Sequence, residues 1–316
     1  MKYRFPGWVL VLFLLAPLSA QIRGPMLGWV WDSRQESIRP VLGITGSSVL
    51  GKGIDLGGPV KHASISGSQE FAVFLSGDTK TAKLVDLRPV ETPSRGLDGV
   101  PDGATRTVLS PRGESALLIY EDPKMVRVVK GLPSEPALVR EIDISVEGAP
   151  VRAAVSDDGA LVALAYPEQK QVILVDENAN RVTLQQELVT KSLNFLEKST
   201  TLLIAAEDGV SVVQGAPANI EFRKIWETTS NAAAAVTEGR ILLVDPAIES
   251  VVEVNLEDGS LRVAQCPCSP TGIVRMSGSG IFRLTEVSAD PLWLLEITES
   301  GLRTVFVPPD AEMPQQ

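Results

Sequence analysis

Hydrophobic residues along this chain come in short runs of about five, and these runs continue from Gly28 to Val307. Each run is rich in Val, Ile, Leu and Ala and is bounded by Gly, Asp, Ser or Pro, as strands bounded by turns are. Residues 189–198 come nearest to an amphipathic helix, but they also fit strand alternation, and the turn-like pair Ser199-Thr200 follows them. The pattern therefore predicts an all-β chain.

The most apolar strand recurs at a nearly constant interval. Its occurrences start 45, 45, 41, 39 and 40 residues apart, at residues 71–75, 116–120, 161–165, 202–206, 241–245 and 281–285. In several units one strand precedes it after a short turn and two strands follow. Four strands in about 40 residues are typical of a β-propeller blade. One such sheet cannot bury both of its faces, and stacking the sheets around an axis does so.

Asp-Gly pairs support hairpin connections within these units. They occur at Asp158-Gly159, Asp208-Gly209 and Asp258-Gly259, where we expect the first, second and third turns of three different units. Asp-Gly is a strong hairpin signal because both residues tolerate positive φ.

Two segments resemble known propellers. Residues 30–43, Val-Trp-Asp-Ser-Arg-Gln-Glu-Ser-Ile-Arg-Pro-Val-Leu-Gly, resemble the third and fourth strands of a WD repeat. Residues 156–163, Ser-Asp-Asp-Gly-Ala-Leu-Val-Ala, are similar to the first turn of many bacterial propellers, including the lactonase-like ones. The Gly-His pair of true WD repeats does not recur, since His62 is the only histidine. The resemblance implies the architecture of the WD-repeat-like and lactonase-like superfamily and no particular family within it.

Six full units run from about Ala63 to Val307, and three N-terminal strand segments precede them. We therefore predict a β-propeller of four-stranded antiparallel blades with seven blades, of which one is incomplete or shared between the two chain ends. Joining strands from both ends would remove exposed sheet edges. The predicted domain covers residues 21–307, and residues 308–316 have the composition of a disordered tail.

The first 20 residues have the order of a secretory signal peptide. Lys2 and Arg4 precede an apolar run of about 11 residues, and Leu18-Ser19-Ala20 provides small residues for cleavage before Gln21. The alternative, a retained membrane anchor, would need about 20 apolar residues. Gln21 also offers no thiol for a lipid anchor. We expect a soluble mature chain without a membrane span, in the periplasm or outside the cell.

The net charge of the chain argues against polyanionic partners. It is −10, and removal of Lys2 and Arg4 with the signal peptide takes it to −12. An acidic protein repels nucleic acid and anionic membrane surfaces. The chain has no Asn-x-Ser/Thr site for glycosylation, which favours a bacterial source.

No catalytic, cofactor-binding or metal-binding residues are predicted. Any triad would have to use His62, which follows a Gly-rich stretch and is expected in a loop, either at the ring mouth or simply in solvent. The sequence has no nucleophile elbow, phosphate loop or paired-histidine spacing. Acidic pairs such as Asp157-Asp158 lack the spacing of a calcium loop, so turn chemistry accounts for them.

The two cysteines and two of the tryptophans are candidate site residues. Cys266 and Cys268 flank Pro267, and in an oxidising compartment a disulfide is the expected state, with free thiols and a redox or metal role as alternatives. Trp29 and Trp31 share one strand face and could form an aromatic binding surface with two further tryptophans, Trp226 and Trp293, or pack between blades.

These observations favour a non-enzymatic binding or scaffold protein of the cell envelope. We expect a monomer that uses loops at one face of the ring to contact a protein, a peptide or another ligand. The alternative is a lactonase-like hydrolase or lyase with its site in the central channel, and a third hypothesis is an extracytoplasmic sensor. Convergent carboxylates or a cluster around His62 in the channel would favour the enzyme.

Overall fold

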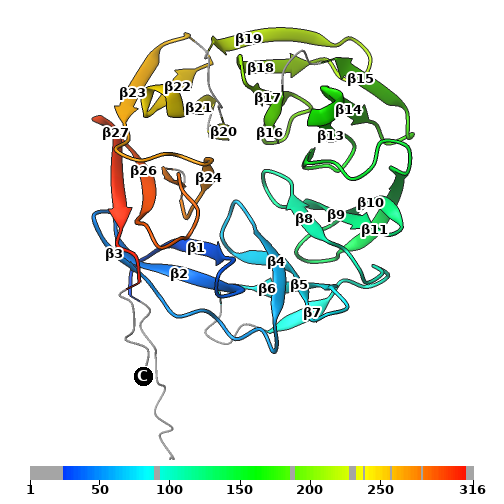
Figure 1. The fold of residues 1–316 in the computed structure, drawn as a ribbon, viewed down its shortest axis with the longest axis horizontal. Helices are drawn as coiled ribbons and strands as arrows, with labels where there is room; N and C mark the ends of the chain where they lie inside the picture. Colours follow the sequence, from blue (N-terminus) through cyan, green and yellow to red (C-terminus); the bar gives the residue numbers. More distant parts are fainter. Residues whose placement is uncertain are drawn as a thin grey trace, which may run out of the picture.

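A computed structural model describes residues 24–88, 93–185, 189–227, 233–237, 239–256, 258–278 and 280–310. These residues form seven sheets arranged in a ring, as Figure 1 shows. Apart from the short 3-10 helices η1 (Pro167–Gln169) and η2 (Pro246–Ile248), the regular structure in these ranges is β-strand. The prediction of an all-β, seven-bladed propeller is confirmed.

The blades follow one another in chain order, and neighbouring strands within each blade are antiparallel. Blade 1 contains β1 (Met26–Asp32), β2 (Ser37–Ile44) and β3 (Ser47–Leu50). Blade 2 contains β4 (Val60–Ile65), β5 (Phe71–Ser76), β6 (Thr81–Asp86) and β7 (Ser94–Gly96). Blade 3 contains β8 (Arg106–Leu109), β9 (Ser115–Glu121), β10 (Lys124–Lys130) and β11 (Ala137–Asp143). Blade 4 contains β12 (Arg152–Val155), β13 (Val162–Tyr166), β14 (Gln171–Val175) and β15 (Arg181–Gln185).

The last three blades repeat this arrangement. Blade 5 contains β16 (Thr190–Phe195), β17 (Leu202–Ala206), β18 (Gly209–Gln214) and β19 (Glu221–Glu227). Blade 6 contains β20 (Ala233–Thr237), β21 (Arg240–Asp245), β22 (Ser250–Asn255) and β23 (Leu261–Gln265). Blade 7 contains β24 (Val274–Arg275), β25 (Ile281–Arg283), β26 (Leu292–Thr298) and β27 (Gly301–Val307). Residues 189–198, which come nearest to a helical pattern in the sequence, contain strand β16, as the strand interpretation predicts.

The second strands of blades 2 to 6 are mostly apolar because neighbouring blades cover both of their faces. In β9, Leu117 and Ile119 pack toward blade 4, whereas Leu118 and Tyr120 pack toward blade 2. Seven hydrophobic clusters of this kind are found, one at each junction between consecutive blades around the ring. A run of apolar residues without strand alternation is therefore what this position requires.

The three Asp-Gly pairs named above lie in the turns expected for them. Gly159 is in the first turn of blade 4, Gly209 in the second turn of blade 5 and Gly259 in the third turn of blade 6, all with positive φ. Each pair therefore sits in a turn between antiparallel strands, as its composition predicts.

Blade 1 is the incomplete one. In the described residues its three strands pair only with one another, so blade 1 is partial and shares no strand with blade 7. The segment that resembles the third and fourth strands of a WD repeat forms β1 and β2, and β3 follows on their outer side. The expected order of these strands is therefore corrected.

Side-chain contacts between blades 7 and 1 close the ring. Apolar residues of both blades form one cluster that includes Val30, Val41 and Leu294. At its edge, the buried Arg39 guanidinium donates to Asp32 at 2.9 Å and to both carboxylate oxygens of Asp310 at 2.6 and 2.7 Å. These contacts form what we call the closing interface. Asp310 belongs to the segment expected to be a disordered tail, of which residues 311–316 lie outside the described ranges.

Candidate functional site

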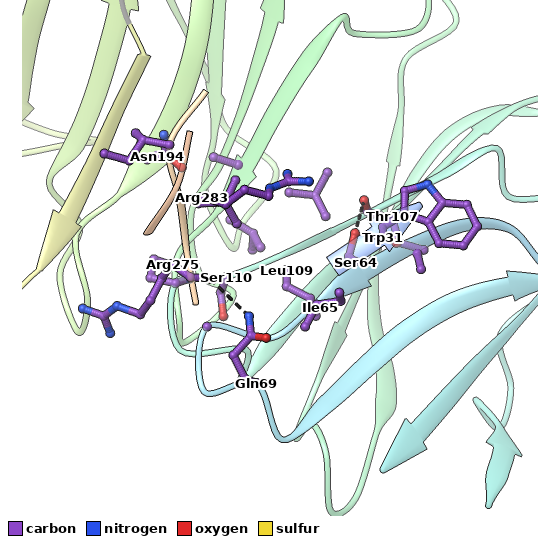
Figure 2. Close-up of a pocket in the computed structure, with 18 of the residues that line it drawn as sticks. Trp31, Ser64, Ile65, Gln69, Thr107, Leu109, Ser110, Asn194, Arg275 and Arg283 are labelled. Carbon is purple, nitrogen blue, oxygen red and sulfur yellow. Dashed lines mark hydrogen bonds between the residues drawn. The ribbon is translucent and has the colours of Figure 1, made fainter. Parts of the chain in front are cut away.

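The inner strands of the blades surround a central cavity of about 470 Å³, a volume typical of ligand pockets. Its wall is made by β4, β8, β12, β16 and β24, together with β1 of blade 1. Figure 2 shows side chains from several blades around it. Trp31, Ile65 and Leu109 contribute apolar surface, and the polar side chains include Asn194 and Arg283. The cavity thus combines apolar walls with hydrogen-bonding groups.

His62 lies within strand β4 and faces this cavity, which corrects its expected place in a loop. Its Nδ1 lies 3.2 Å from Thr107 Oγ1 and accepts the Thr107 backbone N–H at 3.4 Å. Burial, helped by the nearby Arg106 charge, lowers the pKa of His62 to about 4. The imidazole is therefore uncharged at neutral pH.

Two hydroxyl groups lie beside His62 and bond to each other. Thr107 Oγ1 and Ser64 Oγ are 2.8 Å apart, and Ser64 Oγ also donates to the Thr107 carbonyl at 2.8 Å. The Thr107 hydroxyl is therefore in contact with both Ser64 and the His62 imidazole.

The two glutamates of the cavity wall are each paired with an arginine. Glu197, after β16, accepts from Arg275 of β24 at 2.6 Å and so connects blades 5 and 7. Glu286 accepts from Arg283 with both oxygens, at 2.6 and 2.9 Å. Each of these carboxylates is therefore held in an ion pair with an arginine of the cavity wall. In the described ranges no group of three His, Cys, Asp or Glu side chains could hold a metal ion.

Side chains in the turns between first and second strands form hydrogen bonds to neighbouring blades. The buried Asp157 carboxylate in blade 4 accepts the backbone N–H groups of Arg112 in blade 3 and Lys198 in blade 5, at 2.7 and 2.8 Å. Its role in the structure is thus to bind backbone amides, in agreement with the turn interpretation of this acidic pair. Gln69 of blade 2 plays a similar part: its Oε1 accepts the Trp29 N–H of β1, and its Nε2 donates to the Arg275 carbonyl of blade 7.

A serine repeat in these turns escaped sequence reasoning. Ser66, Ser110 and Ser156 each begin the first turn of their blade, and each hydroxyl accepts the N–H of the residue five positions on. The three serines are 44 and 46 residues apart, which is the blade repeat itself. Aligning the first turns rather than the apolar strands would have found them.

The candidate disulfide lies away from the cavity. Cys266 and Cys268 are bonded, with their Cα atoms 5.1 Å apart, in the link between β23 and β24. Cys266 is buried in the cluster between blades 6 and 7. The bond therefore belongs to the framework of the ring and does not take part in the cavity wall.

The four candidate tryptophans lie at three places in the ring. Trp29 is buried between blades 1 and 2, with Trp31 partly buried beside it, and both border the cavity. Trp226 packs between blades 5 and 6, and Trp293 packs against Phe306 with ring centroids 5.7 Å apart. A combined aromatic surface is not formed. Only Trp31 offers the cavity a ring that is not fully buried.

No protein-family model matches the sequence, and no curated protein matches it either. Similar solved structures do exist. A functionally unknown protein from Desulfotomaculum acetoxidans is 14% identical, with a TM-score of 0.60 over 90% of this chain and 99% of that one.

Two further structures show the same fold. A catalytically inactive variant of virginiamycin B lyase from Staphylococcus aureus, solved with quinupristin, is 11% identical, with a TM-score of 0.55 over 90% of this chain and 89% of that one. The WD40 repeats of RRP9 are 9% identical, with a TM-score of 0.56 over 81% and 82% of the two chains. At these identities the likeness establishes the propeller architecture, in accord with the resemblance seen in the sequence. No helix in the described ranges is both long and apolar enough to cross a membrane.

Proposed function

We propose that this protein is an exported, non-enzymatic binding module of the cell envelope, and that its partner enters the central cavity. The observation that carries this proposal is the state of the polar groups in the cavity wall. Both glutamates are ion-paired, and the hydroxyls beside the neutral His62 bond to one another and to backbone. Groups satisfied in this way can recognise a ligand, and the ion pairs leave neither glutamate as a free acid or base. The WD40 neighbour supports a protein-binding role by analogy alone.

Site-specific photo-crosslinking in the native host tests this proposal. A photoreactive residue in place of Leu109, on the cavity wall, is expected to give a discrete cross-linked product. The control replaces Val139, which is 51% exposed on outer strand β11. Products at Leu109 and none at Val139 support binding in the cavity. Products at Val139 alone would place the partner on the outer surface and contradict the proposal.

An enzyme of the lyase type is the second candidate, because His62 and Thr107 are neighbours in a cavity and a lyase shares the fold. Its test is direct. The wild-type protein and a His62→Ala variant are incubated with quinupristin, and the intact compound is followed by mass spectrometry. Loss of quinupristin with the wild type and not with the variant would favour the enzyme over the binding module.

A further inference from the structure

Within the described residues, blade 1 has no counterpart of the innermost strand of the other six blades. In blades 2 to 5 the second strands are buried along almost their whole length, while the outermost strands are mostly exposed where their burial is described. β1 is buried like a second strand, and β3 is partly exposed like an outermost one. The strands of blade 1 therefore correspond to the second, third and fourth strands of a complete blade.

The backbone of β1 is turned toward the missing position. Trp29 lies opposite Pro40 of β2, and Trp31 lies opposite Ile38. The Pro40 and Ile38 carbonyls accept hydrogen bonds on the β3 side of β2, from Gly51 and Ile54. In an antiparallel pair this register directs the N–H and C=O groups of Trp29 and Trp31 away from β2. We call this side of β1 the open edge.

Groups from neighbouring blades already occupy one end of the open edge. Gln69 accepts the Trp29 N–H, and the Ser277 N–H donates to the Leu27 carbonyl at 3.0 Å. This approach requires Gly28, where a Cβ atom would lie 2.8 Å from Gln69 Oε1 and 3.0 Å from Ser277 N. From Trp29 to Trp31 the edge borders the central cavity.

We propose that the open edge of β1 binds an extended peptide segment of a partner protein, which adds as the innermost strand of blade 1. This inference rests on the proposed binding function and names its ligand class. The added strand would run antiparallel to β1, as first and second strands do in the blades. Strand addition supplies affinity through main-chain hydrogen bonds and specificity through the alternating side chains.

The flanks of the open edge define the side chains of the ligand. Ala63 and Ile65 of β4 line the cavity on one side, and Met276 of blade 7, which packs with Val30, lines it on the other. The side chains of an added strand that face these neighbours would be small or β-branched and uncharged. The existing inner strand β12, Arg-Ala-Ala-Val, has this character at its last three positions.

The chain's own C-terminal residues make a poor occupant. Residues 311–316 read Ala-Glu-Met-Pro-Gln-Gln and contain no β-branched or aromatic residue. Pro314 could not donate a ladder hydrogen bond, and Ala, Glu and Pro are depleted in strands. A segment from another protein is therefore the occupant that the observations favour.

Hydrogen exchange with a defined probe tests strand addition. The probe is a capped synthetic peptide that copies residues 151–156, Val-Arg-Ala-Ala-Val-Ser, around β12. With the mature protein it is expected to slow exchange at the Trp31 amide at least 10-fold. The control peptide carries N-methyl groups at alternate positions and should have no effect. Unchanged exchange at Trp31 with saturating probe would overturn strand addition.

Two protein variants supply a matched comparison for the probe. Ile65→Glu, in the flank of the open edge, should weaken probe binding at least 10-fold. Ile44→Glu, at a position 58% exposed on β2, should leave it unchanged. Equal binding by both variants would show that the probe binds elsewhere, and melting curves of both confirm that they are folded.

A truncated chain ending at Asp310 distinguishes the chain's own tail from a partner strand. If strand addition by a partner is right, the truncation leaves Trp31 exchange unchanged in the absence of probe. Faster exchange on truncation would identify residues 311–316 as the occupant and overturn the proposal. Cross-linking at Leu109 without any Trp31 protection would retain cavity binding and reject only its strand-addition form.

Discussion

Closure of the ring depends on a buried arginine that is shared by both ends of the chain. Arg39 is 4% exposed and is bound by Asp32, which is 1% exposed, and by Asp310, which is 37% exposed. In Asp310→Asn the Arg39 charge loses the carboxylate that accepts two of its hydrogen bonds. The bonds to Asp32 and to the Gly51 carbonyl remain.

The size of this effect follows from the two bonds and their exposure. A hydrogen bond to a charged group contributes about 1.5–3 kcal/mol, and solvent screening at the partly exposed Asp310 reduces that figure. We therefore expect Asp310→Asn to lower the free energy of unfolding by about 2 kcal/mol and Tm by about 3–5 °C. Arg39→Met should cost more, about 3–5 kcal/mol, because it leaves the Asp32 carboxylate buried without its cation.

The effect of Asp310→Asn should also depend on pH. The Arg39 guanidinium lowers the pKa of Asp310 below its ordinary value of 3.8. The stabilisation by Asp310 is therefore complete at a pH above 3.8, its ordinary pKa. It is lost as the pH falls through the lower pKa that Asp310 has in the folded protein. Urea unfolding at pH 7 and pH 2 measures both the effect and its loss.

A control and a refuting result complete this experiment. Lys61→Gln removes an exposed ion pair with Glu36 and should change stability by less than about 0.5 kcal/mol. If Asp310→Asn has no larger effect than Lys61→Gln at pH 7, Asp310 does not bind the buried arginine in solution. Blades 7 and 1 would then be joined by the apolar cluster and by other hydrogen bonds, such as the one from Thr45 to Glu296 at 2.7 Å.

Four further predictions can be checked independently. Mass spectrometry of the exported protein should show a mature chain that starts at Gln21, and a membrane-bound precursor would contradict this. The double change Cys266→Ser and Cys268→Ser should shift the unfolding free energy by about 1 kcal/mol or less, because the closed loop is very short; native thiol titration checks the bond itself. The lowered pKa of His62, about 4, means that acid weakens the fold as the pH falls from 6.5 to 4, and His62→Gln should flatten this part of the pH–stability curve. Deleting residues 21–45 removes β1 and β2 and should lower Tm and cause aggregation, whereas a soluble product with unchanged Tm would refute the ring-closure model.

The second strands of the blades could be predicted from the sequence because their burial leaves a simple pattern. Residues 116–120 and 202–206 are apolar throughout, since each strand is covered by a neighbouring blade on both faces. A repeat of such runs near 40 residues determines the architecture before any contact is known. The Asp-Gly turns fix the hairpin order in the same local way.

The cavity wall could not be predicted in this way. An inner strand such as β4, Val-Lys-His-Ala-Ser-Ile, has one edge toward the channel, so polar residues interrupt its pattern and it resembles a loop. His62 was therefore expected in a loop. Contacts such as Glu197 with Arg275 join residues 78 positions apart, and no local pattern encodes that distance.

The partial blade shows where strand counting stops being informative. The sequence contains three strand segments before the six full units, and that number is compatible with a missing first, last or shared strand. Burial shows which strand is missing. β1 carries the buried apolar run of a second strand, so the strand without a counterpart in blade 1 is the first, innermost one. The segment that resembles the third and fourth strands of a WD repeat, residues 30–43, begins within this same strand. The position of an unfilled strand is thus a property of packing, and it places the open edge of β1 at the cavity, where a ligand can reach it.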